Sequence, residues 1–175
     1  MFNLETPSAA PILDGMALLR KIGLGLIVIA LSATVTAAQT AETDEAELSV
    51  VAQWEADPLR IFDAAEIDLE AFIWIARPLV IFADSPNDPN FRRQLELIAE
   101  RPEDLAERDV IVIVDTDASL RSAPREALHP RGFMFALIDK DGRVSLRKPR
   151  PWDLREISRS IDKSPLRQQE IEDRR

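Results

Sequence analysis

The stretch RPLVIFADSPNDPNF, residues 77–91, decides the fold class of this chain. Its apolar run PLVIFA, residues 78–83, is short and continuous, which is typical of a strand buried on both faces of a sheet. Asp88 and Pro89 follow, and an Asp N-cap with proline at the first helical position predicts the start of a helix. From Phe91 onward, apolar residues recur at helical spacing. The stretch therefore predicts a buried strand that leads into an amphipathic helix.

Three further runs predict the other strands of the sheet: residues 110–114, 133–138 and 143–147. The last two flank DKDG, residues 139–142, which predicts a tight turn. Asp117 is expected to cap a helix before the third strand, and a D-x-x-E cap at Asp153 opens the last helix. The order βαβ then αββα predicts an α/β fold with a central mixed four-stranded sheet flanked by helices. That order is the minimal thioredoxin-like topology.

Two stretches resemble a known family: residues 77–91, quoted above, and RGFMFALIDKDGRVSLRKPRPWDLREISRSIDKSPLRQQE, residues 131–170. They are similar to a bacterial domain-of-unknown-function family with a thioredoxin/peroxiredoxin-like fold, related to domains of extracellular sushi-repeat proteins. The resemblance covers about residues 59–170. It implies a thioredoxin-like fold and an exported setting, and it carries no activity to transfer.

The chain contains no cysteine. Thioredoxin-like enzymes act through thiolates, and at the turn after the first predicted strand Ser85 stands where the thiol would be. The sequence therefore excludes a thiol oxidoreductase or peroxidase. His129 is the one histidine, so we expect no metal site and no cofactor. Ser85 with His129 as its base lacks the glycines of a hydrolase elbow, so we assign no catalytic residue.

Residues 1–38 are interpreted as a leader and signal peptide. A short basic stretch, residues 16–21, precedes the apolar run 22–31, and small residues follow up to Ala38. The preceding fifteen residues hold acidic but no basic side chains, so we expect translation to start at Met16. The apolar run is shorter than the roughly 18–20 residues of a spanning helix. We therefore expect cleavage near Ala38 and a periplasmic or secreted protein with no stable membrane span; an uncleaved anchor is the alternative.

The mature chain divides into an acidic linker, residues 39–58, a thioredoxin-like domain, residues 59–164, and a charged C-terminal tail, residues 165–175. The net charge of −9 is unevenly spread: residues 39–138 hold 21 acidic and 9 basic side chains, and residues 139–175 hold 8 and 11. Because nucleic-acid binding needs a basic surface, the acidic body argues against a nucleic-acid partner.

The predicted topology brings polar residues to one edge of the sheet. The candidate ligand or partner edge consists of Asp84, Ser85, Asp88, Asp115, Arg131 and Lys148, with Asp117, His129 and Arg150 nearby. Open α/β folds bind ligands at such an edge. A mixed acidic and basic cluster suits a polar ligand or partner, and a structural salt-bridge rim is the alternative.

A second candidate surface is the basic stripe Arg155, Arg159 and Lys163, spaced four residues apart on the last predicted helix. It could contact an acidic protein or anionic lipid headgroups, and a solvated helix face is the alternative. Together these features favour an exported binding or interaction module, whose partner could be another exported protein. The alternative is a cysteine-independent enzyme or small-ligand carrier that uses the Asp/Arg cluster at the sheet edge.

Overall fold

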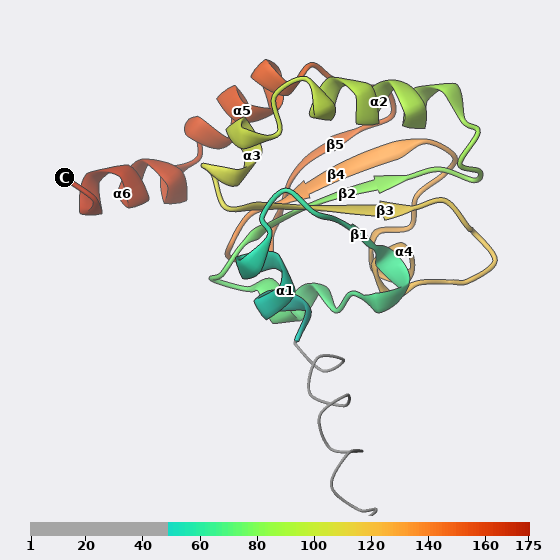
Figure 1. Ribbon diagram of the computed structural model, residues 1–175, viewed down its shortest axis with the longest axis horizontal. Coiled ribbons are helices and arrows are strands. Elements are labelled where there is room, and N and C mark those ends of the chain that lie inside the picture. Colours follow the sequence, from blue (N-terminus) through green and yellow to red (C-terminus); the bar gives the residue numbers. More distant parts are fainter. Residues whose placement is uncertain (1–48) are drawn as a thin grey trace, which may run out of the picture. The chain divides into compact units, whose positions relative to one another are not determined.

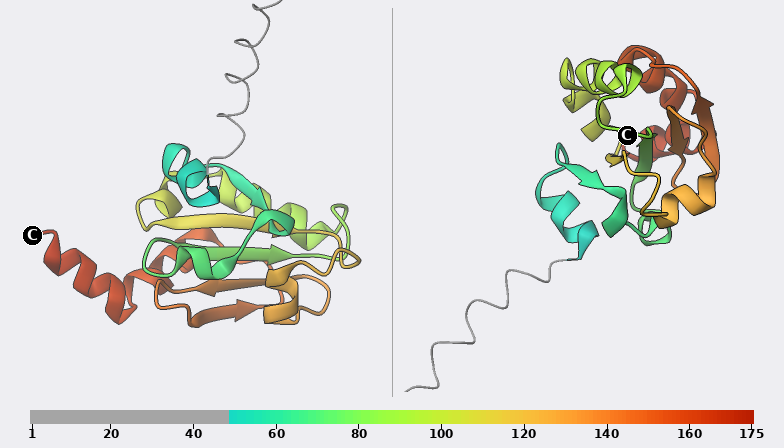
Figure 2. Two further views of the ribbon diagram at one scale, coloured as in Figure 1. Left: turned by 90° about the horizontal axis from the view of Figure 1, so that it is seen from below. Right: turned by 90° about the vertical axis from the view of Figure 1, so that its right-hand side faces the viewer.

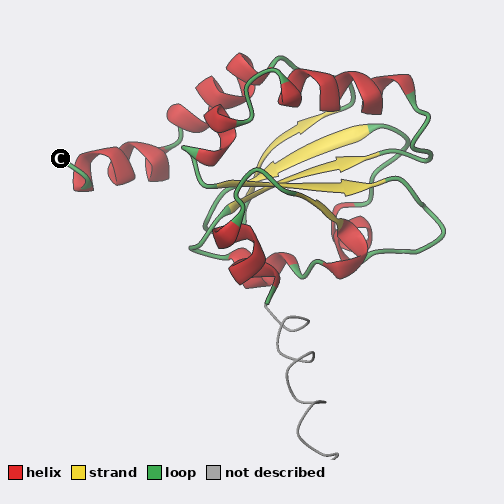
Figure 3. Ribbon diagram, in the orientation of Figure 1, coloured by secondary structure: helices red, strands yellow, loops and turns green. Residues whose placement is uncertain are grey.

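The structure, a computed structural model, describes residues 49–175 and builds a five-stranded sheet between two layers of helices (Figures 1 and 3). The strands are β1 (Ile61–Asp63), β2 (Arg77–Phe82), β3 (Val110–Asp115), β4 (Met134–Ile138) and β5 (Val144–Lys148). Their order across the sheet is β1-β3-β2-β4-β5. The first three are mutually parallel, whereas β4 is antiparallel to β2 and β5 is antiparallel to β4. The predicted α/β class is confirmed.

The prediction of four strands is wrong, because β1 adds a fifth strand beside β3. Ile61 pairs with Val112 and Asp63 with Val114 in parallel register. β1 has only three residues, which is too short for an alternating pattern to identify it in the sequence. It becomes a strand because the edge of β3 offers it backbone hydrogen-bond partners.

The helices are α1 (Val50–Ala56), α2 (Pro89–Ala99), α3 (Glu103–Ala106), α4 (Ala123–Leu128), α5 (Leu154–Asp162) and α6 (Pro165–Asp173), with 3-10 turns η1 (Ala64–Glu66) and η2 (Leu69–Phe72). In Figure 1, α2, α3 and α5 lie on one side of the sheet, and α1 and α4 lie on the other. Side chains along β2 alternate between the two apolar cores: Leu79 and Ile81 join the first, Val80 and Phe82 the second. Burial on both sides explains why these strands are continuous apolar runs.

Two predicted boundaries change. The expected linker ends earlier than residue 58, because Val50–Ala56 forms α1 and Trp54 packs into the second core. Ser49 caps that helix by accepting a hydrogen bond from the backbone N–H of Ala52 at 3.2 Å. The helix before β4 starts at Ser122 and not at Asp117, which instead caps a turn at Ser119.

The expected leader, residues 1–38, and the first part of the expected linker lie outside the described residues. Within residues 49–175, no helix is both long and apolar enough to cross a membrane. The chain's last helix, α6, leads away from the helical layers and ends at the C-terminus (Figures 1 and 2). Residues 165–175, expected as a charged tail, therefore consist largely of a helix.

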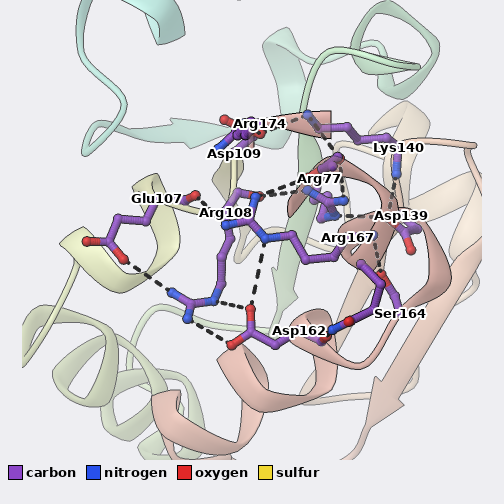
Figure 4. A network of polar contacts seen from close by, with 12 residues as sticks. Arg77, Glu107, Arg108, Asp109, Asp139, Lys140, Asp162, Ser164, Arg167 and Arg174 are labelled. Atoms are coloured by element: carbon purple, nitrogen blue, oxygen red, sulfur yellow. Dashed lines mark hydrogen bonds and ion pairs between the residues drawn. The ribbon is translucent and has the colours of Figure 1, made fainter. Parts of the chain in front are cut away.

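A buried arginine connects the amino end of β2 to three other segments (Figure 4). The side chain of Arg77 is 1% exposed. Its Nε donates to Oδ1 of Asp139 at 2.9 Å, its Nη1 to the carbonyl of Arg108 at 2.9 Å and its Nη2 to Oε1 of Glu170 at 2.7 Å. One side chain thus joins β2, the end of β4, the segment before β3 and α6.

Helix α6 is attached mainly through further charged contacts of the same network. Arg167 is buried and donates to Glu170 at 3.1 Å and to the carbonyl of Glu107 at 3.0 Å. Nearby, Arg108 holds both carboxylate oxygens of Asp162 at 2.9 Å. The helix itself shows no strong apolar stripe, so ion pairs decide its position.

The charge of Glu170 should make this attachment sensitive to acid. Burial raises its pKa, but hydrogen bonds from Arg77 and Arg167 outweigh that effect and hold the pKa at about 2. Because the folded state has the lower pKa, its contribution to stability is present above the ordinary value near 4.5 and is lost as pH falls toward about 2. The urea midpoint of the parent protein should fall as the pH is lowered between these values. In Glu170→Gln, we expect this fall to be smaller, because the variant has no carboxylate to protonate at this position. An equal fall in both proteins would contradict this assignment.

Candidate functional site

The carboxyl ends of β2 and β3 meet at a buried ion pair. Asp115, the last residue of β3, is 5% exposed. Arg125 in α4 donates to it from Nη2 at 2.7 Å, and its Nε lies 3.1 Å from both carboxylate oxygens. Ser122, the N-cap of α4, donates its hydroxyl to the other carboxylate oxygen. The short helix α4 is therefore positioned by side chains that converge on one carboxylate.

The guanidinium of Arg125 also reaches β2. Its Nη2 donates to the carbonyl of Ala83 at 2.8 Å, and its carbon lies 5.5 Å from the centre of the Phe82 ring. Asp84, which follows, lies 3.6 Å from Nη1 and is mostly exposed. These contacts hold the guanidinium at the carboxyl end of β2, because Phe82 is the last residue of that strand and Ala83 and Asp84 follow it.

A hollow of about 570 Å³ opens beside this ion pair. Its lining residues are Arg121, Arg125, Glu126, His129, Pro130 and Arg131. Arg121 pairs with Glu126 at 3.1 Å. In contrast, the side chains of His129 and Arg131 make no hydrogen bond or ion pair within residues 49–175. The hollow therefore combines one fixed arginine with an arginine and an imidazole that are free to bind.

The backbone around the hollow bends sharply. His129 ends α4 with φ of 48°, in the left-handed region, where a helix C-cap is usually glycine or asparagine. Arg147 of β5 donates to the carbonyl of Leu128 at 2.9 Å and so satisfies one of the open groups at this helix end. This turn directs the chain back to the start of β4 and brings Arg131 to the sheet edge.

The residues predicted for this edge separate into two groups. Asp84, Asp115 and Arg131 lie around Arg125. Ser85 and Asp88 serve the turn before α2: the Ser85 hydroxyl accepts from the N–H of Asn87 at 3.1 Å, and Asp88 caps α2 through two backbone N–H groups.

Lys148 lies on the other face of the sheet, where its ammonium is 3.9 Å from the centre of the Trp152 ring. The predicted basic stripe on α5 is exposed, and Arg159 pairs with Glu156 at 2.9 Å. Arg155 and Lys163 make no side-chain ion pair within the described residues.

Sequence reasoning did not identify Arg121, Ser122 and Arg125 as parts of this edge. The helix was predicted to begin at an Asp117 cap, five residues before the Ser122 cap, so Ser122 and Arg125 were not recognised as its cap and first turn. A Ser-Ala-Pro run at residues 122–124 was the available signal, because serine caps followed by proline commonly begin helices.

Chemically, the site is suited to binding. The carboxylate of Asp115 is occupied by Arg125 and Ser122, and Ser122 donates its proton to that carboxylate. Ser122 is also 8% exposed, and its hydroxyl oxygen accepts from the backbone N–H of Arg125 at 3.2 Å, so this hydroxyl serves as the cap of α4. The free guanidinium of Arg131, beside an arginine held in place, can instead recognise carboxylate or phosphate oxygens.

A five-stranded sheet in the order β1-β3-β2-β4-β5, with β4 and β5 antiparallel and helices on both faces, defines a thioredoxin-like domain. The absence of cysteine from the chain makes it one without thiol chemistry. The chain belongs to the family described as "Domain of unknown function (DUF4174)", whose sequence profile matches residues 68–170. The predicted resemblance to a thioredoxin-like domain of unknown function is thereby confirmed.

Two solved structures are similar to this chain. A reduced 2-Cys peroxiredoxin from Plasmodium vivax is 16% identical, with a TM-score of 0.48, over 59% of this chain and 85% of that one. A mitochondrial 2-Cys peroxiredoxin from Plasmodium falciparum is 17% identical, with a TM-score of 0.41, over 55% of this chain and 79% of that one. Among curated proteins, none matches the chain.

Proposed function

We propose that this chain is an exported, non-redox binding module that recognises an acidic segment of a partner protein at the hollow beside Arg125. The proposal rests on the difference in contacts between two arginines that line that hollow. Arg125 is held by Asp115 and the carbonyl of Ala83, whereas Arg131 next to it has no partner among the described residues. Because Arg125 is already held in place, binding of a carboxylate has to order only the side chain of Arg131.

Electrostatic complementarity supports an acidic partner. The hollow is lined by three arginines and one glutamate, and that glutamate is already paired. Arg125 is balanced by Asp115 and Arg121 by Glu126, so Arg131 supplies the unpaired positive charge that can orient a partner of opposite charge at this edge. The signal-peptide pattern and the resemblance to domains of extracellular sushi-repeat proteins support an exported setting for that contact.

The shape of the site favours a protein over a reaction substrate. The hollow is open to solvent, and of its lining residues only Glu126 is a carboxylate. An enzyme that works through an Asp/Arg cluster needs convergent carboxylates with perturbed pKa values in an enclosed site. The buried carboxylate at this edge is Asp115, and the guanidinium of Arg125 compensates its charge.

The test is purification of the tagged full chain from the exported fraction of the organism that encodes it. The parent protein should begin near Gln39 and retain an acidic partner protein. Arg131→Glu should reduce the retained partner about tenfold or more, as expected for reversal of a charge at a contact centre.

Arg155→Glu is the matched control, because it makes the same change on the exposed basic stripe of α5 and should leave the partner bound. Loss of the partner in Arg155→Glu but not in Arg131→Glu would place the contact on α5 and overturn the proposed site. A retained metabolite in place of a protein, seen by native mass spectrometry, would support the carrier or enzyme alternative. Protein found only in the cytoplasm would overturn the exported setting.

A further inference from the structure

Trp74, at the opposite end of the sheet, is both exposed and strained. Its side chain is 67% exposed, and its φ of 64° lies in the left-handed region, which bulky residues rarely adopt. The backbone N–H of Trp74 donates to the carbonyl of Lys140 at 2.7 Å and holds this conformation. Strained residues of this kind concentrate at functional sites, and an exposed indole leaves a large apolar surface in water.

The indole forms one wall of a hollow of about 280 Å³ whose other wall is α6. Its lining residues are Trp74, Lys140, Leu166, Gln169, Glu170 and Asp173. The hollow lies at the amino end of the parallel strands, because Trp74 precedes β2 and Lys140 follows β4. It is therefore separate from the carboxyl-end hollow beside Arg125.

One free charge remains in this hollow after the ion pairs are assigned. Glu170 is held by Arg77 and Arg167, and Lys140 lies 2.8 Å from Asp109 and 3.4 Å from Glu170. Asp173 makes no side-chain hydrogen bond or ion pair within residues 49–175, and neither does Gln169. The unsatisfied groups beside the indole are thus a carboxylate and a neutral amide.

We propose that this hollow binds a guanidinium group, which stacks on the indole of Trp74 and pairs with the carboxylate of Asp173. Tryptophan has the most favourable ring for cation–π contacts. A guanidinium is planar, weakly hydrated and able to donate two parallel hydrogen bonds to one carboxylate, whereas an ammonium is compact and strongly hydrated. The side-chain carbonyl of Gln169 can accept a further hydrogen bond.

Isothermal titration of the full chain with Nα-acetyl-arginine amide tests the proposal. Saturable binding is expected, and the neutral isostere Nα-acetyl-citrulline amide should bind about tenfold more weakly, since it lacks the charge. Agmatine distinguishes the source of the group: equal affinity indicates a free guanidino amine, and weaker affinity indicates an arginine within a peptide. Equal affinity for the arginine and citrulline compounds would overturn the proposal.

Two variants locate the binding. Trp74→Asn should reduce the affinity for Nα-acetyl-arginine amide about tenfold, and Asp173→Asn should reduce it up to about fivefold, the range of an exposed ion pair. Asparagine tolerates the left-handed backbone at residue 74, so the urea midpoint of Trp74→Asn should not fall below that of the parent.

Leu120→Ala is the control, because Leu120 is 62% exposed and belongs to the loop after β3, at the other end of the sheet. It should bind like the parent. Unchanged affinity in both Trp74→Asn and Asp173→Asn would show that the guanidinium binds elsewhere and would overturn the site.

Discussion

Replacement of Arg77 by methionine is expected to lower the free energy of unfolding by about 3–5 kcal/mol, as for other buried ion pairs broken on one side. Arg77 is the largest fully buried side chain of the structure's described part. Its removal leaves Asp139 and Glu170, both largely shielded from water, without their main cation. The carbonyl of Arg108 loses its donor as well. Urea unfolding at neutral pH, followed by circular dichroism, measures the loss.

The loss of local stability in Arg77→Met should differ between parts of the molecule. Because Glu170 anchors α6, hydrogen exchange in α6 should accelerate more than exchange in β2 and β3, which are held by the two cores. Arg77→Lys keeps the charge but cannot serve three acceptors in one plane, so its loss should be intermediate.

The matched control is the double variant Arg77→Met, Asp139→Asn, because Arg77 is the ion-pair partner of Asp139, whereas Glu170 keeps Arg167 and Lys140. It removes the stranded carboxylate and should recover part of the loss, because a buried ion pair replaced as a whole is often tolerated. A double variant no more stable than Arg77→Met would show that packing, and not the uncompensated charge of Asp139, explains the effect.

The parts of the fold that could be predicted from the sequence are those fixed by apolar periodicity. The runs at 78–83, 110–114 and 133–138 became β2, β3 and β4 with shifts of about one residue. These strands are buried on both faces, so nearly every residue had to be apolar. Asp88 and Pro89 marked the start of α2 correctly, because a cap is a local interaction that depends on adjacent residues.

Elements that are held by long-range contacts showed neither apolar periodicity nor a local cap that could have predicted them. β1 is defined by its pairing with β3, about fifty residues away, and α6 by the ion pairs of Arg167 and Glu170. The left-handed backbone at Trp74 could not be predicted from the sequence either, since bulky residues rarely adopt it. The candidate site has the same origin: charged residues are ordinarily exposed, so nothing local indicates that Arg125 is anchored on Asp115.

The second large effect is expected at that anchor. Asp115→Asn should lower the free energy of unfolding by about 3 kcal/mol, because the guanidinium of Arg125, whose side chain is 11% exposed, loses its close counter-charge. Asp84 cannot replace it: its carboxylate lies 3.6 Å away and is 64% exposed. Asp84→Asn is therefore the control and should cost at most about 1 kcal/mol.

A double-mutant cycle with Arg125→Met separates the ion pair from other effects of the substitutions. If the pair is the cause, Asp115→Asn should cost much less in the Arg125→Met background than in the parent. Full additivity in urea unfolding would instead assign the cost to the lost hydrogen bond from Ser122.

The same variants distinguish anchoring from recognition in the proposed binding edge. Arg131 has no partner within the described residues, so Arg131→Glu should reduce partner capture about tenfold or more while leaving the urea midpoint within the range of ordinary surface substitutions. Asp115→Asn should lower both, since it destabilises the domain and also frees the guanidinium that the hollow presents. A loss of stability in Arg131→Glu as large as that in Asp115→Asn would mean that Arg131 is a structural residue, and the hollow would then be part of a salt-bridge rim.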